Sequence, residues 1–119
     1  MKTAALKKNG VTLIETVEVA NRFRERMRGL LGRPSLGTSR AMYLNPCSCI
    51  HTFFMKFTID LVFLDRDMKV EKIVTKIPPG RVISGGMKAR SVLEMESGWF
   101  PEGDLKVGDE VFMCPHRIL

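Results

Sequence analysis

The segment Ile59–Leu64 constrains the fold more than any other part of the sequence. Its six residues are apolar except for Asp60, and a run of aromatic residues precedes them. A half-buried strand alternates apolar and polar side chains, whereas this run is continuous, which indicates a strand buried on both faces. The turn at 65–68 and the apolar residues at 69–77 then predict a hairpin. We therefore expect a core strand here with a neighbour directly after it.

Most of the remaining signal is also typical of β-strands. Val11–Ala20 is rich in β-branched residues and follows Asn9 and Gly10, a turn dipeptide. Residues 1–10 show no comparable pattern, and we expect them to be loose. Shorter apolar segments predict three further strands, over residues 41–45, 91–95 and 110–113.

One amphipathic helix is predicted over residues 21–32. Asn21 offers an N-cap and Gly32 a C-terminal stop. Apolar residues lie on one face of this helix, at Phe23, Met27, Leu30 and Leu31. The sequence thus predicts a single domain over 1–119 that is mainly β, or α+β by content. We expect one compact antiparallel barrel or sandwich, with the helix packed on it.

The charge of the chain is unevenly distributed. The net charge is +6, and the first forty residues hold nine Lys and Arg against three Glu. Such an excess attracts polyanions or anionic membranes weakly, although a solvated basic face is the simpler interpretation. We do not expect a nucleic-acid partner. No apolar run is long enough for an export signal or a membrane span, which predicts a cytoplasmic protein with no membrane span.

Two thiols and a histidine lie close together at Cys47, Cys49 and His51, and Cys114 and His116 form a second pair. Thiolate and imidazole are the ligands that zinc prefers. Structural zinc sites usually space their cysteines as C-x₂₋₄-C, however, and one intervening residue does not form that knuckle. We therefore predict no metal or cofactor, with Cys47, Cys49 and His51 as the weak candidates. A reactive thiol stays open as an alternative.

Charged residues in apolar segments suggest a polar pocket. Asp60 and Glu94 interrupt two predicted core strands, and a buried carboxylate needs a partner. Arg81 and Arg90 are plausible partners, and the same residues could form a purely structural ion-pair network. The aromatic residues near this segment are expected in the core or in the wall of a pocket, namely Phe53, Phe54, Phe57 and Phe63.

Five blocks of the sequence resemble a known family in order and spacing. They read ERMRGLLGRPSL, HTFFMKFTIDLVFLDRDMKV, PPGR, ARSVLEMESG and LKVGDEV. The chain is similar over about residues 17–112 to the domain-of-unknown-function family numbered 192, which is bacterial-type and uncharacterised. The resemblance implies a compact barrel or sandwich with a packed helix, and it implies no activity. The positions that it carries over are His51, Thr52, Met55, Asp60, Arg81, Glu94 and Gly98, with Cys47 and Cys49 as weaker matches.

These observations favour a small non-enzymatic binding domain, whose partner is an unidentified small molecule or protein. We predict that the partner contacts a pocket lined by His51, Thr52, Met55, Asp60, Arg81 and Glu94. One alternative is a thiol- or metal-dependent enzyme that uses His51 with Cys47 or Cys49. Another is an accessory domain that docks on a larger assembly through its basic helix and an exposed Trp99.

Overall fold

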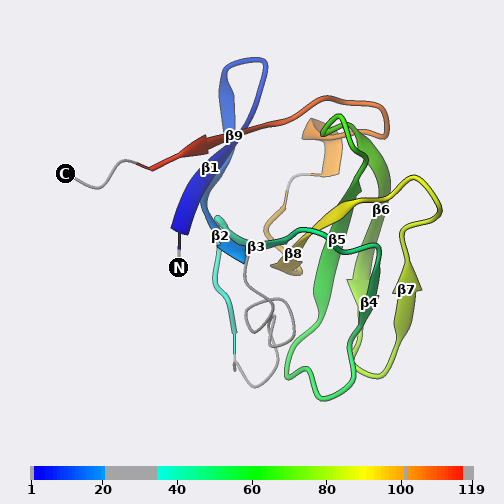
Figure 1. The fold of residues 1–119 in the computed structure, drawn as a ribbon. Helices are drawn as coiled ribbons and strands as arrows, with labels where there is room; N and C mark the ends of the chain where they lie inside the picture. The colour runs from blue at the N-terminus through cyan, green and yellow to red at the C-terminus, as the bar shows by residue number, and fades with distance from the viewer. Residues whose placement is uncertain (1, 21–34, 101, 117–119) are drawn as a thin grey trace.

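The computed structural model describes residues 2–20, 35–100 and 102–116. In this part of the chain the regular elements are strands and one short 3₁₀ helix, which confirms the prediction of a mainly β fold (Figure 1). The predicted helix over 21–32 lies outside the described residues. The strands are β1 (Lys2–Lys8), β2 (Val11–Ala20), β3 (Arg40–Leu44), β4 (Cys49–His51), β5 (Ile59–Leu64), β6 (Val70–Ile77), β7 (Val82–Ser84), β8 (Ser91–Glu96) and β9 (Phe112–Pro115), with a short 3₁₀ helix at Glu102–Asp104.

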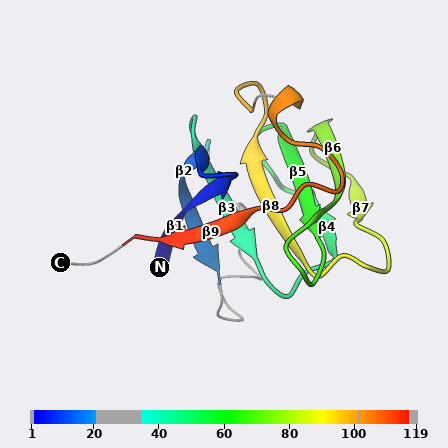
Figure 2. The same cartoon turned by 90° about the horizontal axis from the view of Figure 1, so that it is seen from above.

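Seven strands form one sheet in the order β6-β5-β8-β3-β2-β1-β9, and β4 pairs with β7 in a second, two-stranded sheet. Figure 2 shows how strongly the large sheet curves from β6 through β8 to β2 and β1. All pairs are antiparallel except β2 and β3, which run parallel. The antiparallel prediction is wrong at this one pair. A parallel pair needs a crossover of a dozen or more residues, and residues 21–39 provide a connection of that length.

The described strands do not close into a barrel, so that part of the prediction is wrong. The edge strands β6 and β9 share no ladder. The start of β6 instead meets the segment before β9 through an isolated bridge between Lys69 and Glu110. Flanking backbone hydrogen bonds of 2.8–2.9 Å support this bridge. We call this junction, residues 68–70 with residues 108–111, the seam.

Strands β5 and β1 differ in how well their sequences predict them. β5 is buried along its whole length, as its apolar run predicts. β1 contradicts the expectation of a loose N-terminus, because it pairs with both β2 and β9. Only Ala4 and Leu6 of β1 are buried, while its lysines lie nearer the surface. Two buried residues among lysines give a weak alternation, which explains why this strand was missed.

Buried apolar side chains form two clusters. The seam-side core comprises Leu6, Ile14, Val17, Ala41, Tyr43, Val62, Leu64, Val70, Leu93, Met95, Phe100, Leu105 and Val111. The tip-side core comprises Ala20, Leu36, Met42, Leu44, Ile50, Met55, Ile59, Leu61, Phe63, Ile77, Ala89 and Val92. Neighbouring residues of β5 and β8 alternate between the clusters, as expected when a strand is covered on both faces.

The two-stranded sheet covers the tip-side core. Ile50 of β4 is buried in that core, and its pairing partner Ile83 of β7 packs against it. The neighbours of Ile50, Cys49 and His51, are exposed because successive side chains of a strand point to opposite faces. This small sheet therefore turns His51 and the loops beyond it toward solvent.

Candidate functional site

Two loops meet at the end of the small sheet and form the tip, which we define as residues 51–57 and 78–82. His51 and Val82 pair at the point where β4 ends and β7 begins. In Figure 1 these loops lie at the lower end of the molecule, whereas the β5–β6 turn beside the seam lies at the upper end. The tip contains four of the six predicted site residues: His51, Thr52, Met55 and Arg81.

Thr52 links the two loops of the tip through hydrogen bonds. Its hydroxyl donates to the carbonyl oxygen of Pro78 at 2.8 Å and accepts from the backbone N–H of Arg81 at 2.8 Å. Its backbone N–H donates to the carbonyl of Arg81, and its own carbonyl accepts from Met55 and Gly80. The Thr52 side chain is fully buried. Since these bonds all lie within the tip, Thr52 positions the loops and does not face solvent.

Asp60 supports the same region from the adjoining strand. Lys76 and the residue before it lie opposite Asp60 in a bulge of β6. Lys76 has a φ of 55°, and its backbone N–H donates to Asp60 Oδ1 at 2.8 Å. The Ser97 hydroxyl donates to the same oxygen at 2.7 Å. Asp60 thus stabilises the entry into the 78–82 loop, and among the described residues it forms no ion pair with Arg81 or Arg90.

Phe54 is the least expected residue of the tip. Its side chain is 87% exposed and its φ is 66°, in the left-handed region that bulky residues avoid. Phe53 is also exposed, and its ring stacks on His51 with centroids 5.7 Å apart. Met55 points the other way, into the tip-side core. The expectation of a core or pocket-wall position is therefore wrong for Phe53 and Phe54, although it holds for Phe63, which is fully buried.

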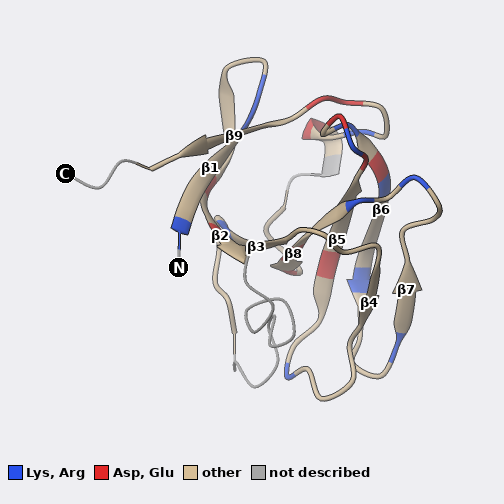
Figure 3. Ribbon diagram, viewed as in Figure 1, with Lys and Arg blue, Asp and Glu red and all other residues tan. Residues whose placement is uncertain are grey.

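The tip is surrounded by cations and lacks carboxylates. Lys56 and Arg81 are exposed in its loops, whereas the exposed Lys76 lies outside them, near the end of β6. No Asp or Glu occurs in residues 41–59 or 72–93, the segments that build the tip and the small sheet. Figure 3 shows blue segments and no red ones in the loops at this end, with several red segments around the opposite end. The tip therefore has a positive potential that its own loops do not offset.

Glu94 lies apart from the tip loops, in the middle of β8. It pairs with Met42 and Leu61, two members of the tip-side core, and is 5% exposed. Asp60 pairs with Met95 instead, so the Asp60 and Glu94 side chains leave opposite faces of the sheet. Desolvation raises the pKa of the Glu94 carboxyl to about 7. The structure therefore brings four predicted site residues together, places Asp60 behind them and separates Glu94 from Asp60.

A second glutamate on the same face was missed by the sequence reasoning. Glu96 Oε2 accepts the backbone N–H groups of Leu36 and Gly37, at 3.0 and 2.8 Å. It thereby holds the segment that leads into β3. Its spacing of two from Glu94 in an otherwise apolar strand was the available signal, because it places both carboxylates on one face.

The thiols do not form a metal centre in the part of the chain that the structure describes, where no group of three potential ligands occurs. Cys49 and His51 are exposed on one side of β4, and the Cys47 thiol donates to the carbonyl of Cys49 at 3.3 Å. The imidazole of His116 lies 2.9 Å from the Thr3 hydroxyl. These contacts are local ones between neighbouring strands or loops.

A groove of about 420 Å³ opens beside the seam, at the other end of the molecule. Its apolar lining comes from Tyr43, Met68, Val111, Phe112 and Met113, and Asp67 and Glu110 contribute carboxylates. None of the predicted site residues lies in it. The two ends of the molecule thus differ in their carboxylates: the tip loops contain none, whereas Asp67 and Glu110 line the seam groove, with Arg66 and Lys69 beside them.

The family model for DUF192, described as "Uncharacterized ACR", matches residues 4–113. The chain belongs to the DUF192 family. The matched region begins well before residue 17, where the sequence resemblance starts, because it includes strands β1 and β2. Membership confirms the family predicted from the sequence and brings no activity with it.

Solved structures share the fold of this DUF192 chain. A protein of unknown function from Novosphingobium aromaticivorans DSM 12444 is 21% identical, with a TM-score of 0.78 over 92% of this chain and 83% of the other. A Sinorhizobium meliloti 1021 protein, described as a "putative transcription regulator", is 19% identical, with a TM-score of 0.77 over 94% of this chain and 92% of the other. At these identities the likeness concerns the fold alone.

No curated protein matches the sequence of this DUF192 member significantly. Within residues 2–20, 35–100 and 102–116, no helix has the length and apolar character needed to cross a membrane.

Proposed function

We propose that this DUF192 protein is a small non-enzymatic binding domain whose partner contacts the tip. The observation that carries the proposal is Phe54, which combines an exposed aromatic side chain with a strained backbone. Strain of this kind costs of the order of 1–3 kcal/mol and persists only where the surrounding structure imposes it, which is typical of binding and catalytic loops. Thr52 and Asp60 supply that surrounding structure.

The six predicted residues then divide by role. His51 and Arg81 are exposed at the tip and are the polar groups that a partner can reach. Thr52, Met55 and Asp60 are buried and hold the loops that carry them. Glu94 contributes to the core beneath the small sheet and does not meet the partner directly. The predicted polar pocket is thereby replaced, within this proposal, by a projecting contact surface.

The observations favour this surface over an enzyme built on Cys47 or Cys49. A nucleophilic thiol needs a base within hydrogen-bond reach. The ring of His51, the base in that alternative, instead stacks on the exposed Phe53.

Site-specific photocrosslinking tests the proposal. p-Benzoylphenylalanine replaces Phe54 in one variant and Phe112 in another, and cells that naturally make the protein are irradiated. Phe112 is a matched control because it is a half-exposed phenylalanine near the seam. We expect adducts at position 54 well in excess of those at position 112. Equal yields would contradict the proposal, and a higher yield at 112 would move the contact to the seam groove.

A further inference from the structure

We infer that the partner of the tip is an anionic lipid surface, into which Phe54 inserts while the surrounding cations meet the headgroups. This inference rests on the proposed function, because it identifies the partner of the same surface. Three observations carry it: the apolar side chains exposed at the tip, the cations around them and the shape and rigidity of the loops.

The exposed apolar side chains of the tip come from both loops. Phe54 is 87%, Val82 61% and Phe53 45% exposed. Val82 pairs directly with His51, and the His51 ring stacks on Phe53. Val82, His51 and Phe53 therefore lie together at one end of the small sheet, and Phe54 follows Phe53 in the chain. Aromatic and aliphatic side chains gain most when they leave water for the boundary between headgroups and acyl chains. Burial of one phenylalanine there strengthens binding by about tenfold or more.

The charges at the tip match a negatively charged surface. Lys56 is two residues from Phe54, and Arg81 directly precedes Val82. A cation close to an anionic membrane strengthens binding by about fivefold. Since residues 41–59 and 72–93 contain no carboxylate, no acidic side chain from these segments opposes that attraction.

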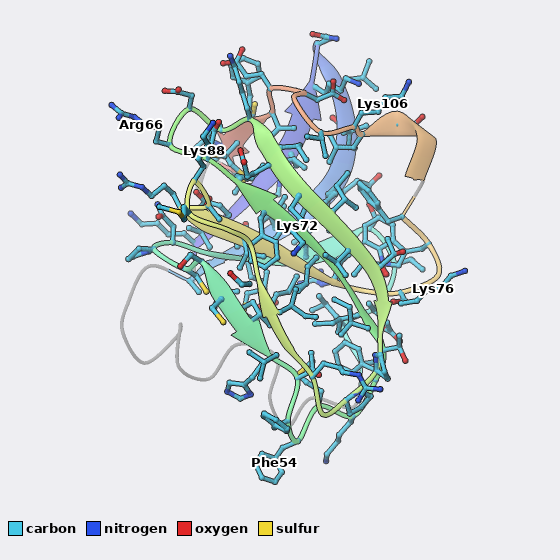
Figure 4. The ribbon with its side chains drawn as sticks, turned by 90° about the vertical axis from the view of Figure 1, so that its right-hand side faces the viewer. Phe54, Arg66, Lys72, Lys76, Lys88 and Lys106 are labelled. Carbon is cyan, nitrogen blue, oxygen red and sulfur yellow. The ribbon has the colours of Figure 1, made fainter. Side chains whose placement is uncertain are left out.

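The tip projects from the body of the molecule, and this shape favours a membrane over other partners. Figure 4 shows Phe54 pointing away from the ribbon at one extremity, with Arg66 and Lys106 at the opposite extremity. A small ligand would require a concave site that encloses it. A nucleic-acid strand would require several aromatic rings open for stacking along a groove. One projecting ring, backed by cations and by an aliphatic Val82, suits insertion into an interface.

The loops are held in place before any partner arrives. The hydroxyl of Thr52 joins the aromatic loop to the loop that carries Arg81, and Asp60 fixes the bulge at Lys76. An ordered surface binds more tightly than a flexible one because it loses less conformational entropy on binding. The fold therefore presents the apolar and cationic groups together as one surface.

Vesicle sedimentation with the full chain tests the inference. The probes are phosphatidylcholine vesicles and vesicles that also contain phosphatidylglycerol. We expect binding to the anionic vesicles and much weaker binding to the neutral ones, with a decrease at high salt. Phe54→Ser should lower the partition coefficient about tenfold. Lys56→Gln combined with Arg81→Gln should lower it more than tenfold on anionic vesicles only.

Matched controls come from the opposite end of the molecule. Phe112→Ser removes a half-exposed phenylalanine, and Lys106→Gln removes a lysine far from Phe54 (Figure 4). Neither should change vesicle binding. The inference would be overturned if the wild-type chain ignored anionic vesicles, or if the controls lost as much binding as the tip variants. It would equally be overturned if a labelled single-stranded oligonucleotide bound in a Phe54-dependent way while vesicles did not.

Failure of the inference is distinguishable from failure of the proposed function. Crosslinks from position 54 to a protein or to a small molecule, without vesicle binding, would reject the lipid and keep the tip as the contact surface. Equal crosslinking at 54 and 112 would reject both. Lipid adducts at position 54 together with the vesicle result would support both.

Discussion

The tip and the seam each contain a bulky residue with a left-handed backbone. Phe54 has a φ of 66° and Met68 a φ of 61°. At the seam, Met68 packs against the seam-side core, and the Tyr43 hydroxyl donates to its sulfur at 3.5 Å. At the tip, Phe54 contacts solvent over most of its surface. The same backbone strain is thus compensated by packing at one end of the molecule and not at the other.

This difference in side-chain packing between Met68 and Phe54 indicates where a binding surface lies in this fold. The strain at Met68 accompanies a packed side chain and a seam closed by backbone hydrogen bonds, so it has a structural explanation. At Phe54 the backbone is held by the turn that the Met55 N–H and the Thr52 carbonyl close, but the side chain gains no packing in return. Neither feature, exposure or strain, would be informative alone, because scattered exposed apolar residues are common. Their coincidence at Phe54 is what favours a contact surface.

The largest expected effect concerns the core beneath the tip. The pKa of Glu94 is raised to about 7 in the folded protein, from an ordinary value of 4.5. Between these values the folded state binds more protons than the unfolded state, so stability falls as pH rises through this range. The loss reaches about 3 kcal/mol once pH exceeds 7. Glu94→Gln should remove this fall, as measured by urea unfolding at acidic and at slightly alkaline pH.

Glu110→Gln is the matched control at the seam, because Glu110 is exposed. It should keep the pH profile of the wild type. Parallel profiles for wild type and Glu94→Gln would contradict the desolvation of the buried Glu94 carboxyl.

The next effect tests how the tip is held. Thr52→Val keeps the size of the side chain and removes the hydroxyl that links Pro78 and Arg81. The free energy of unfolding should fall by about 2 kcal/mol, because the Pro78 carbonyl and the Arg81 N–H each lose their bond to the buried hydroxyl. Thr58→Val, in the same loop but exposed, should change it by less than about 0.5 kcal/mol. Equal effects in chemical denaturation would mean that Thr52 does not hold the loops.

The sequence predicted much of the fold wherever a local pattern was strong. The continuous apolar run of β5 and the turn at Asn9 and Gly10 were both interpreted correctly. The parallel pairing of β2 with β3 was missed because register between distant strands leaves no local pattern. The seam, which replaces a β6–β9 ladder, was missed for a related reason. Its bridge joins Lys69 to Glu110, and nothing near either residue indicates that the two meet.

The sequence predicted where the candidate site lies, but it predicted a pocket where the structure has an exposed surface. His51, Thr52, Met55 and Arg81 do lie together, because β4 and β7 pair. The exposure of Phe53 and Phe54 could not be inferred, since an aromatic run before a core strand normally predicts burial. One alternative function also expected an exposed Trp99 as a docking surface. Trp99 is instead half-buried and packs against the seam-side core, to which its neighbour Phe100 belongs.

The smallest effect is the most direct test of the comparison, because it exchanges both left-handed residues for glycine. Glycine adopts positive φ without strain. Phe54→Gly should therefore raise the free energy of unfolding by up to about 1 kcal/mol, since little packing is lost there. Met68→Gly gains the same relief and loses contacts with the seam-side core, so it should lower stability by about 1 kcal/mol.

Thermal and urea unfolding measure both variants, and vesicle sedimentation follows on the same samples. Phe54→Gly should be at least as stable as the wild type and yet bind anionic vesicles about tenfold more weakly. Met68→Gly should bind them normally wherever it is folded. If Phe54→Gly lowered the free energy of unfolding instead, the phenylalanine side chain would be stabilising the folded chain. Packing would then compensate the strain at Phe54, as it does at Met68. The comparison is supported if Phe54→Gly raises the free energy of unfolding, Met68→Gly lowers it, and only Phe54→Gly weakens vesicle binding. The two ends would then use the same backbone geometry for different purposes.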